Sequence, residues 1–225
     1  DTPTTIASEI ILLGLDDWTG NKISEIGSLQ PADPGRGLEG EEELAEFKLT
    51  APKLKGVSLT YTPTARVMYN YQTKSTIQFS FATTELIRGE PQQSTVQVTT
   101  TGGPFSIVLR GSLPVISSTN PTAKVQLEIQ NVGGGVAGVS KNANDIDSIN
   151  FDITRKKPDG TGFSCNPAIG NIRLIGGKSR ILTCTITLSP SSISRADFAT
   201  AVVDINLNYY YIVDTQTSVK VKGTT

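Results

Sequence analysis

Hydrophobic and polar residues alternate along residues 125–130. Val125, Leu127 and Ile129 share one side of an extended backbone, and the glutamines and glutamate between them share the other. This period of two is typical of a β-strand with one buried and one solvated face. The alternation then stops at a short stretch made of Asn131, Gly133, Gly134 and Gly135. Because glycine permits positive φ and close passage of another segment, this stretch predicts a bulge or an abrupt strand end.

Many further stretches are rich in β-branched and aromatic residues and are separated by glycine, proline and polar turns. They predict strands at 5–14, 46–50, 57–62, 66–72, 75–82, 94–101, 105–110, 148–155, 171–175, 179–188, 201–213 and 217–222. We expect 66–72 and 75–82 to form a hairpin with facing aromatic stripes. In 201–213, we expect one face to be buried, formed by Val203, Ile205, Leu207, Tyr209 and Tyr211. The sequence therefore predicts an all-β fold.

The stretch 99–104, Thr-Thr-Thr-Gly-Gly-Pro, is the best candidate for a domain boundary, because it is built from turn-forming residues. We therefore predict two tandem Ig-like β-sandwich domains. Residues 1–102 would form the first, with an apolar N-terminal strand and an acidic loop. Residues 103–225 would form the second, in which successive strands and short turns match an Ig-like sandwich.

The run 128–137, Glu-Ile-Gln-Asn-Val-Gly-Gly-Gly-Val-Ala, resembles the N-x-G-x-G-x-A signature of CARDB-like, Ig-like β-sandwich domains. Such domains occur in archaeal and bacterial cell-surface proteins, and the resemblance extends at most over 105–223. It implies that the second half of the chain is an Ig-like sandwich of a cell-surface protein. From the residues alone, a glycine-rich turn in any β-sandwich is the alternative.

The N-terminal stretch is strongly apolar, and its aliphatic side chains cannot all face water: Ile6, Ile10, Ile11, Leu12 and Leu13. One interpretation is the first strand of the chain's own sandwich. The other is a donor strand that leaves its subunit and completes the sheet of a neighbouring copy through main-chain hydrogen bonds. The position near a chain end makes such a donor strand geometrically feasible.

The charge balance and the absence of histidine exclude several classes of function. Lysine and arginine number 20 against 21 acidic residues, so the net charge is −1, and no binding to nucleic acid or anionic membranes is expected. The chain contains no histidine, which excludes Ser-His-Asp and Cys-His catalytic sites and histidine zinc sites. We expect a protein that is not an enzyme and has no cofactor.

The charge is unevenly distributed, because residues 36–46 hold five glutamates and Arg36 as the only base. Such a run is typical of a solvated loop. A cation-binding or partner-facing acidic surface is the alternative.

The two cysteines, Cys165 and Cys184, are 19 positions apart in a β-rich region. Their even number and the absence of histidine predict a disulfide rather than a metal site. By loop-closure entropy, the bridge would contribute about 3 kcal/mol. A reactive thiol pair is the alternative, but the close Cys-X-X-Cys spacing of redox motifs is missing. A disulfide implies an oxidising, extracellular setting.

Oxygen-bearing side chains follow the glycine stretch at alternating positions: Asn142, Asn144, Asp145 and Asp147. Calcium prefers such ligands, yet the glycine and distal glutamate of a helix-loop-helix site are absent. Asx-turns are therefore the leading interpretation, and calcium is the alternative.

The sequence begins with Asp1 and holds no apolar stretch long enough to span a membrane. We expect a secreted chain whose signal or anchor has been removed. The expected function is a non-catalytic extracellular structural or adhesive protein, a homo-oligomer or a partner of another surface protein. A filament subunit of archaeal type that assembles by donor-strand exchange is one form of it. The alternative is a carbohydrate- or protein-binding module of a larger surface protein, and the sequence identifies no small-molecule ligand.

Overall fold

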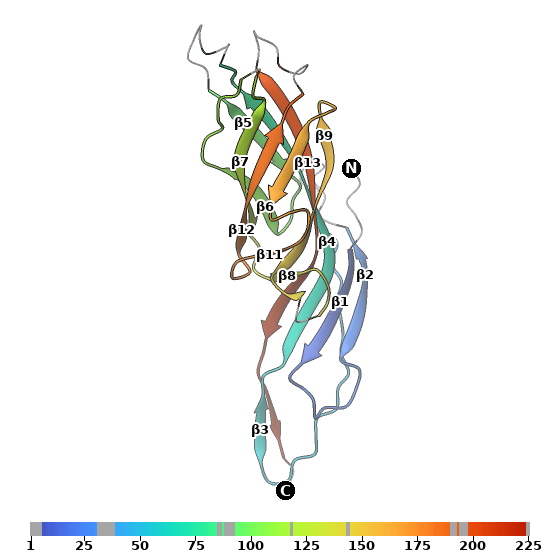
Figure 1. The fold of residues 1–225 in the computed structure, drawn as a ribbon. Coiled ribbons are helices and arrows are strands. Elements are labelled where there is room, and N and C mark those ends of the chain that lie inside the picture. Colours follow the sequence, from blue (N-terminus) through green and yellow to red (C-terminus); the bar gives the residue numbers. More distant parts are fainter. Residues whose placement is uncertain are drawn as a thin grey trace. The chain divides into compact units, whose positions relative to one another are not determined.

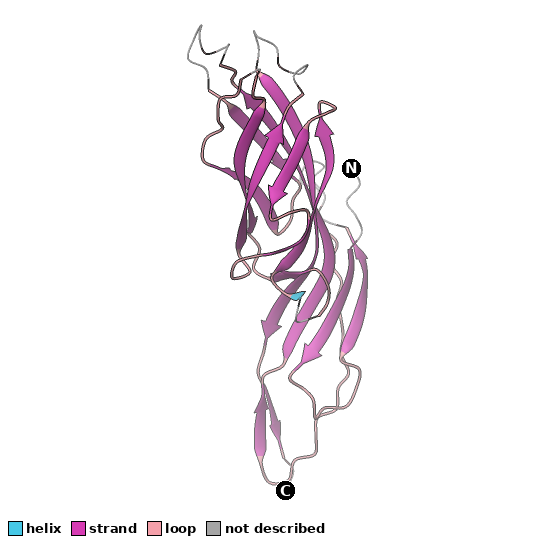
Figure 2. Ribbon diagram, in the orientation of Figure 1, coloured by secondary structure: helices cyan, strands magenta, loops and turns pink. Residues whose placement is uncertain are grey.

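The fold was analysed in a computed structural model. It describes residues 6–30, 39–84, 87, 93–117, 119–142, 145–189, 193 and 198–223, apart from the side chains of residues 6, 7 and 28. These residues form the strands β1 to β14 and no α-helix. A short helical turn at Asp145 is the single helical feature in this part of the chain (Figure 2). The predicted all-β class is confirmed.

The contacts within the chain divide it into two compact units. Unit 1 comprises residues 1–71 and 210–225, and unit 2 comprises residues 72–209. The strands β4 (Thr64–Phe81) and β13 (Ala199–Gln216) each contribute residues to both units. The predicted boundary between residues 102 and 103 lies inside unit 2, and the tandem arrangement of two domains stays a prediction.

Unit 2 contains two antiparallel sheets (Figure 1). The first has the order β11 (Gly170–Arg173), β9 (Ser148–Lys157), β13 and β4, with β5 (Thr95–Thr100) paired to β4 and β8 (Val136–Gly138) paired to β13. The second has the order β10 (Gly162–Asn166), β12 (Ser179–Thr187), β7 (Thr122–Asn131) and β6 (Phe105–Arg110).

The two sheets of unit 2 pack face to face through aromatic rings. Phe79 on β4 lies 6.4 Å from Phe163 on β10, and Phe105 on β6 lies 4.7 Å from Tyr209 on β13, measured between ring centroids. Such offset and edge-to-face pairs add to the stabilisation that comes from burying the rings. Unit 2 is therefore built as a two-layered β-sandwich.

The predicted hairpin of 66–72 and 75–82 is wrong, because these residues form the single 18-residue strand β4. Thr73, which lies between the two predicted strands, points into the core of unit 2, where its hydroxyl lies 2.6 Å from the hydroxyl of Tyr209. That hydrogen bond satisfies the buried threonine, so a polar residue fits inside a continuous strand. The two aromatic stripes consequently share one face of one strand.

The strand predicted at 201–213 is present as β13, which extends to Ala199 and Gln216. The five residues expected on its buried face are at most 2% exposed: Val203, Ile205, Leu207, Tyr209 and Tyr211. The period of two thus predicted the core side of this strand correctly.

Unit 1 contains one main sheet, in which β13 and β4 are followed by β1 (Ile6–Leu13) and β2 (Ile23–Leu29). Its other sheet is the antiparallel pair β3 (Ser58–Tyr61) and β14 (Val219–Lys222), which we call the ribbon. The strand predicted at 46–50 is wrong, since this stretch is irregular and only Thr50 forms a bridge, to Thr19. Strand β2 was not predicted, because its apolar residues recur every third position, at 23, 26 and 29.

Candidate assembly surface

The glycine stretch after β7 is organised by the side chain of Asn131. Its amide nitrogen donates hydrogen bonds to the carbonyl oxygens of Gly135 at 2.9 Å and Gly177 at 3.1 Å. Its amide oxygen accepts one from the Gly133 nitrogen at 3.1 Å. Asn131 therefore holds two loops of unit 2 together, and strand β7 ends at this residue, as the pattern predicts.

The glycines of this stretch do not adopt the conformation expected of them. None of Gly133, Gly134 and Gly135 has a positive φ, and a Cβ on Gly134 would meet no atom within 4 Å. The stretch instead presents apolar side chains to solvent, with Val132 exposed by 61% and Ile175 on the neighbouring turn by 68%. The hydrogen bonds of Asn131 indicate a structural role. The conformation of the glycines does not indicate a binding role.

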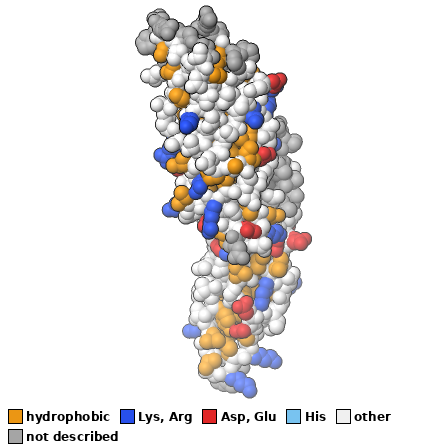
Figure 3. Space-filling model, in the orientation of Figure 1, with side chains coloured by type: hydrophobic (Ala, Val, Ile, Leu, Met, Phe, Trp, Pro, Cys, Tyr) orange, Lys and Arg blue, Asp and Glu red, His pale blue; other side chains and the backbone are white. Residues whose placement is uncertain are grey.

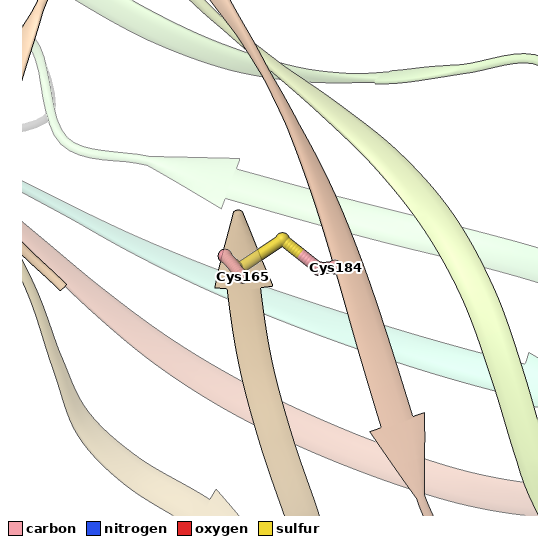
Figure 4. The surroundings of a disulfide bond; sticks show 2 residues. All are labelled: Cys165 and Cys184. Atoms are coloured by element: carbon pink, nitrogen blue, oxygen red, sulfur yellow. A yellow bond between two sulfur atoms is a disulfide. The ribbon is translucent and has the colours of Figure 1, made fainter. Parts of the chain in front are cut away.

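The predicted disulfide is confirmed. Cys165 on β10 and Cys184 on β12 stand directly opposite each other in the antiparallel pair and are bonded (Figure 4). Cys184 is fully buried in unit 2. The bond links an outer strand of the second sheet to its neighbour.

The four candidate calcium ligands are not all within the described residues, because Asn144 lies outside them. The carboxylate of Asp145 accepts a hydrogen bond from the Ser140 hydroxyl, and the backbone of Asp147 bonds to Ala137 and Leu174. In the described part of the chain, no three histidine, cysteine or acidic side chains form a group that could hold a metal ion. The contacts of Asp145 and Asp147 are those of a structural loop, and calcium binding stays untested.

The apolar N-terminal strand lies inside the chain's own sheet. β1 pairs with β2 on one side and with β4 on the other, so that Ile10 stands opposite Ser24 and Val67, and Leu12 stands opposite Ala65. The side chains of Ile10, Ile11 and Leu12 are half-buried, and Leu13 is 38% exposed. The side chain of Ile6 lies outside the described residues.

One face of the unit 1 sheet is apolar and incompletely covered. We call it the open face. The register places these side chains on it: Ile10, Leu12, Ala65, Val67 and Tyr69. On β13, Tyr211 contacts Tyr69 and is itself buried, whereas Val213 is 38% exposed. On β4, the same face is fully buried within unit 2, from Thr73 to Phe81, whereas Ala65, Val67 and Tyr69 in unit 1 are only half-buried. Hydrophobic side chains are visible at the surface over this part of the chain (Figure 3).

The irregular segment 39–49 approaches the opposite face of the same sheet at Gly27. Glu43 lies 3.8 Å from the position of a Cβ on Gly27, on the side away from the open face. Glu41 accepts a hydrogen bond from the Gln30 nitrogen at 2.8 Å and donates its own backbone N–H to the Gln30 oxygen at 2.9 Å. The acidic segment therefore follows β2, the outer strand of the sheet, and its glutamates are exposed.

The ribbon is amphipathic. Tyr61 stands opposite Val219 and Leu59 opposite Val221, so one side is apolar, while Lys220 and Lys222 occupy the other. Trp18 packs edge-on against Tyr61 with a centroid distance of 5.5 Å and covers part of the apolar side. Leu59 is nevertheless 46% exposed. A two-stranded ribbon is only marginally stable by itself, so the packing of Trp18 on Tyr61 contributes to its stability.

An ion pair lies on the other face of this sheet, because Arg66 stands opposite Ile11 and alternates with the open-face residues Ala65 and Val67. Arg66 donates two hydrogen bonds to Asp214, from Nε at 2.9 Å and from the terminal nitrogen at 2.8 Å. The hydrogen bonds and charge of Arg66 lower the pKa of Asp214, although partial burial opposes the shift. Burial, together with the nearby phenols of Tyr211 and Tyr71, raises the pKa of Tyr69 to about 12, so this ring stays neutral.

Unit 2 carries a second candidate, a half-open hollow of about 310 Å³ over β6, β7 and β12. Its lining includes Arg110, Lys124, Gln126 and Thr183. Next to it, Glu128 accepts hydrogen bonds from Gln130 and Arg110. Burial works to raise the pKa of Glu128, but these hydrogen bonds, the Arg110 charge and a hydrogen bond from Ser179 outweigh it, so the pKa is lowered.

The described residues include no helix long and apolar enough to cross a membrane. Comparisons with protein-family models, with curated proteins and with solved structures find no match to this chain.

Proposed function

We propose that this chain is a non-catalytic structural or adhesive protein of the cell surface that associates with copies of itself. The observation that carries the proposal is the open face of the unit 1 sheet. Its side chains Ile10, Val67 and Tyr69 belong to strands whose register is fixed, yet they are only half-buried. Exposed apolar faces of this kind mark protein-protein contacts.

An extracellular location is supported by the disulfide between Cys165 and Cys184, because such bonds persist mainly in oxidising compartments. The resemblance of 128–137 to CARDB-like surface domains points the same way and suggests an archaeal or bacterial surface. A filament is the form of assembly that we infer from an apolar face open to a further copy.

Donor-strand exchange is the specific route that we propose to test. Because β1 lies between β2 and β4, and β2 pairs with β1 alone among the described strands, the two would have to move together. The β1–β2 hairpin of one copy would then take the place beside β4 of the next copy, with the same register.

The first experiment measures the mass of the native particle by light scattering, with electron micrographs of the same sample. Large particles or filaments are the expected result. A monomer of 24.0 kDa at every concentration would overturn the proposal.

A second experiment tests whether β1 pairs with β4 of its own copy or with β4 of another copy. Ile10→Cys with Val67→Cys places two thiols directly opposite each other across β1 and β4. After oxidation, a non-reducing gel shows linked copies if β1 is exchanged, and a cross-linked monomer if it is not. Ile10→Cys alone is the control, since one thiol cannot produce a ladder of linked copies.

The alternative function, a carbohydrate- or protein-binding module, is favoured by the hollow in unit 2. Its arginine, lysine, glutamine and threonine side chains are suited to hydrogen bonds with a polar ligand. A glycan array with the wild-type protein and with Lys124→Ala/Gln126→Ala tests this function. Selective binding that the double variant abolishes would favour it over self-assembly.

A further inference from the structure

Part of strand β7 has a neighbouring strand on one side only. On that side, β12 pairs with residues 122–130. On the other side, β6 pairs with residues 126–131 and ends at Arg110, which stands opposite Gln126. Within the described chain, residues 122–125 therefore have no strand partner on the β6 side, and we call this side of them the free edge.

The main-chain groups of Thr122 and Lys124 point toward the free edge. The N–H of Asn131 donates to the carbonyl oxygen of Lys178, which directly precedes β12. Main-chain groups alternate in direction along a strand, and the register of β7 has no shift, so its odd-numbered residues bond toward β12 and its even-numbered residues point the other way. No described residue forms a hydrogen bond with the main chain of Thr122 or Lys124 on this side. Such a row of unpaired groups is a template for a further strand.

The half-open hollow of unit 2 lies beside the free edge, because Lys124 and Val125 are among the residues that line it. Arg110 on β6 and Thr183 on β12 both stand opposite Gln126. Lys124 is two positions from Gln126 and shares its face of the sheet. This face is the outer one, since the residues of β7 that alternate with them are buried in the core. Two cationic side chains and several polar ones are thus grouped at the free edge.

The positive charge of the hollow is only partly compensated. Glu128 is the one acidic residue in the four strands of this sheet, and its side chain, 6% exposed, forms an ion pair with Arg110. Arg110 remains 53% exposed, and its guanidinium has more N–H donors than this one carboxylate uses. The ion pairs between described residues do not include Lys124. The hollow therefore carries positive charge that no described carboxylate neutralises.

We propose that the free edge and the hollow bind an extended peptide segment of a partner protein, which pairs with β7 as an added strand and brings a carboxylate to Arg110 and Lys124. In strand addition, main-chain hydrogen bonds provide affinity and side chains provide specificity. Charge-assisted hydrogen bonds to a carboxylate are stronger than those between neutral groups. The unpaired main chain favours a peptide over a saccharide, and none of the residues that line the hollow has an aromatic ring on which a sugar could stack.

This inference rests on the alternative function, a binding module, and gives the chemistry of its ligand. It concerns unit 2, whereas the proposed self-assembly uses the open face of unit 1. Four residues of a strand span about 13 Å, so the free edge has room for a peptide with about four paired residues.

Binding is measured by fluorescence anisotropy with three dye-labelled pentapeptides. The first, Thr-Val-Glu-Val-Thr, has blocked ends and a side-chain carboxylate. The second has glutamine in place of glutamate, and the third is the glutamine peptide with a free C-terminal carboxylate. We expect the first or the third peptide to bind at least about tenfold more tightly than the second. The comparison of the first with the third identifies the source of the carboxylate.

The cation is tested with Lys124→Gln, which should weaken binding of the carboxylate peptide by at least about tenfold and leave the glutamine peptide unaffected. Lys156→Gln, at an exposed lysine on β9 of the same unit, is the matched control and should leave both affinities unchanged. Arg110 is kept in place, because its loss would leave Glu128 buried without a counter-charge.

Strand addition is tested with two further versions of the peptide that binds, each N-methylated at one of two adjacent main-chain nitrogens. Only alternate N–H groups of an extended peptide face one neighbouring strand. One methylated peptide should therefore lose at least about tenfold in affinity, while the other should keep it. Equal effects of the two methylations would overturn the pairing with β7.

The outcomes separate this inference from self-assembly, because light scattering measures the particle mass of the same samples, and Lys124→Gln should leave that mass unchanged. If no carboxylate peptide binds at millimolar concentration, or if Lys156→Gln weakens binding as much as Lys124→Gln, the peptide site is overturned while self-assembly is decided by the particle mass. Selective binding of a uronate-containing saccharide on the glycan array, in place of the peptides, would overturn the choice of a peptide.

Discussion

At the scale of single residues, Asn131 is the side chain with the clearest role. Its amide group makes three hydrogen bonds, and one of them reaches Gly177, 46 positions further along the chain. A short polar side chain that satisfies backbone groups of two loops fixes their relative positions, because buried polar groups are costly to leave unpaired.

Replacing this side chain should therefore destabilise unit 2. We expect Asn131→Ala to lower the free energy of unfolding by about 1 to 3 kcal/mol in urea denaturation. Asn142→Ala, at an exposed asparagine further along the same region, serves as control and should change stability by less than about 0.5 kcal/mol. Equal stability of the two variants would show that the loops do not depend on Asn131.

The ion pair of Arg66 and Asp214 gives a residue-level prediction about pH. Because the folded protein lowers the pKa of Asp214, the pair stabilises the fold above the ordinary aspartate pKa of about 4, and this stabilisation is lost as the pH falls through the lowered value. The side chains are 31% and 40% exposed, so solvent screening limits the effect to about 1 kcal/mol or less.

Urea denaturation of Asp214→Asn at several pH values measures this effect. The stability difference from wild type should be largest near neutral pH and should shrink below about pH 4. Asp159→Asn removes an ion pair whose aspartate is 91% exposed, and should show almost no difference at any pH. A difference for Asp214→Asn that grew on acidification would contradict the assignment.

At the scale of elements, the disulfide joins the outer strand β10 to β12. It closes a loop between residues 19 positions apart, and such a cross-link restricts the unfolded chain. We expect Cys165→Ala/Cys184→Ala to lower the free energy of unfolding by about 3 kcal/mol.

Reductant should have the same effect on the wild-type protein and no effect on the double variant. The comparison of the two under reducing conditions is therefore the control, because it separates loss of the bond from loss of the side chains. A wild-type stability that is independent of reductant would mean that the bond does not support the fold.

At the scale of the whole molecule, β4 and β13 each belong partly to unit 1 and partly to unit 2. This division differs from the predicted boundary at residue 102. The fragment 103–225 lacks β4, whose Ile77, Phe79 and Phe81 are fully buried in unit 2. Each large buried side chain contributes about 2 to 5 kcal/mol, so their joint loss approaches or exceeds the whole stability of a typical domain.

We therefore expect the isolated fragment 103–225 to be unfolded. Circular dichroism and the dispersion of its proton spectrum measure this, with the full chain as reference. A cooperative thermal transition of the fragment would support the tandem domains that the sequence suggests.

The sequence by itself determined the strand class, the buried face of β13, the end of β7 at Asn131 and the cysteine pairing. These features are local or follow from having only two cysteines, so alternation and spacing are sufficient to predict them. Tertiary structure alone decided that Thr73 continues a strand, because its partner Tyr209 is 136 positions away. It also placed β1 between β2 and β4 and left one face of that sheet half-covered. Strand order depends on segments that are distant in the chain, and so does the covering of a sheet face. Hydrophobic periodicity does not encode either of them.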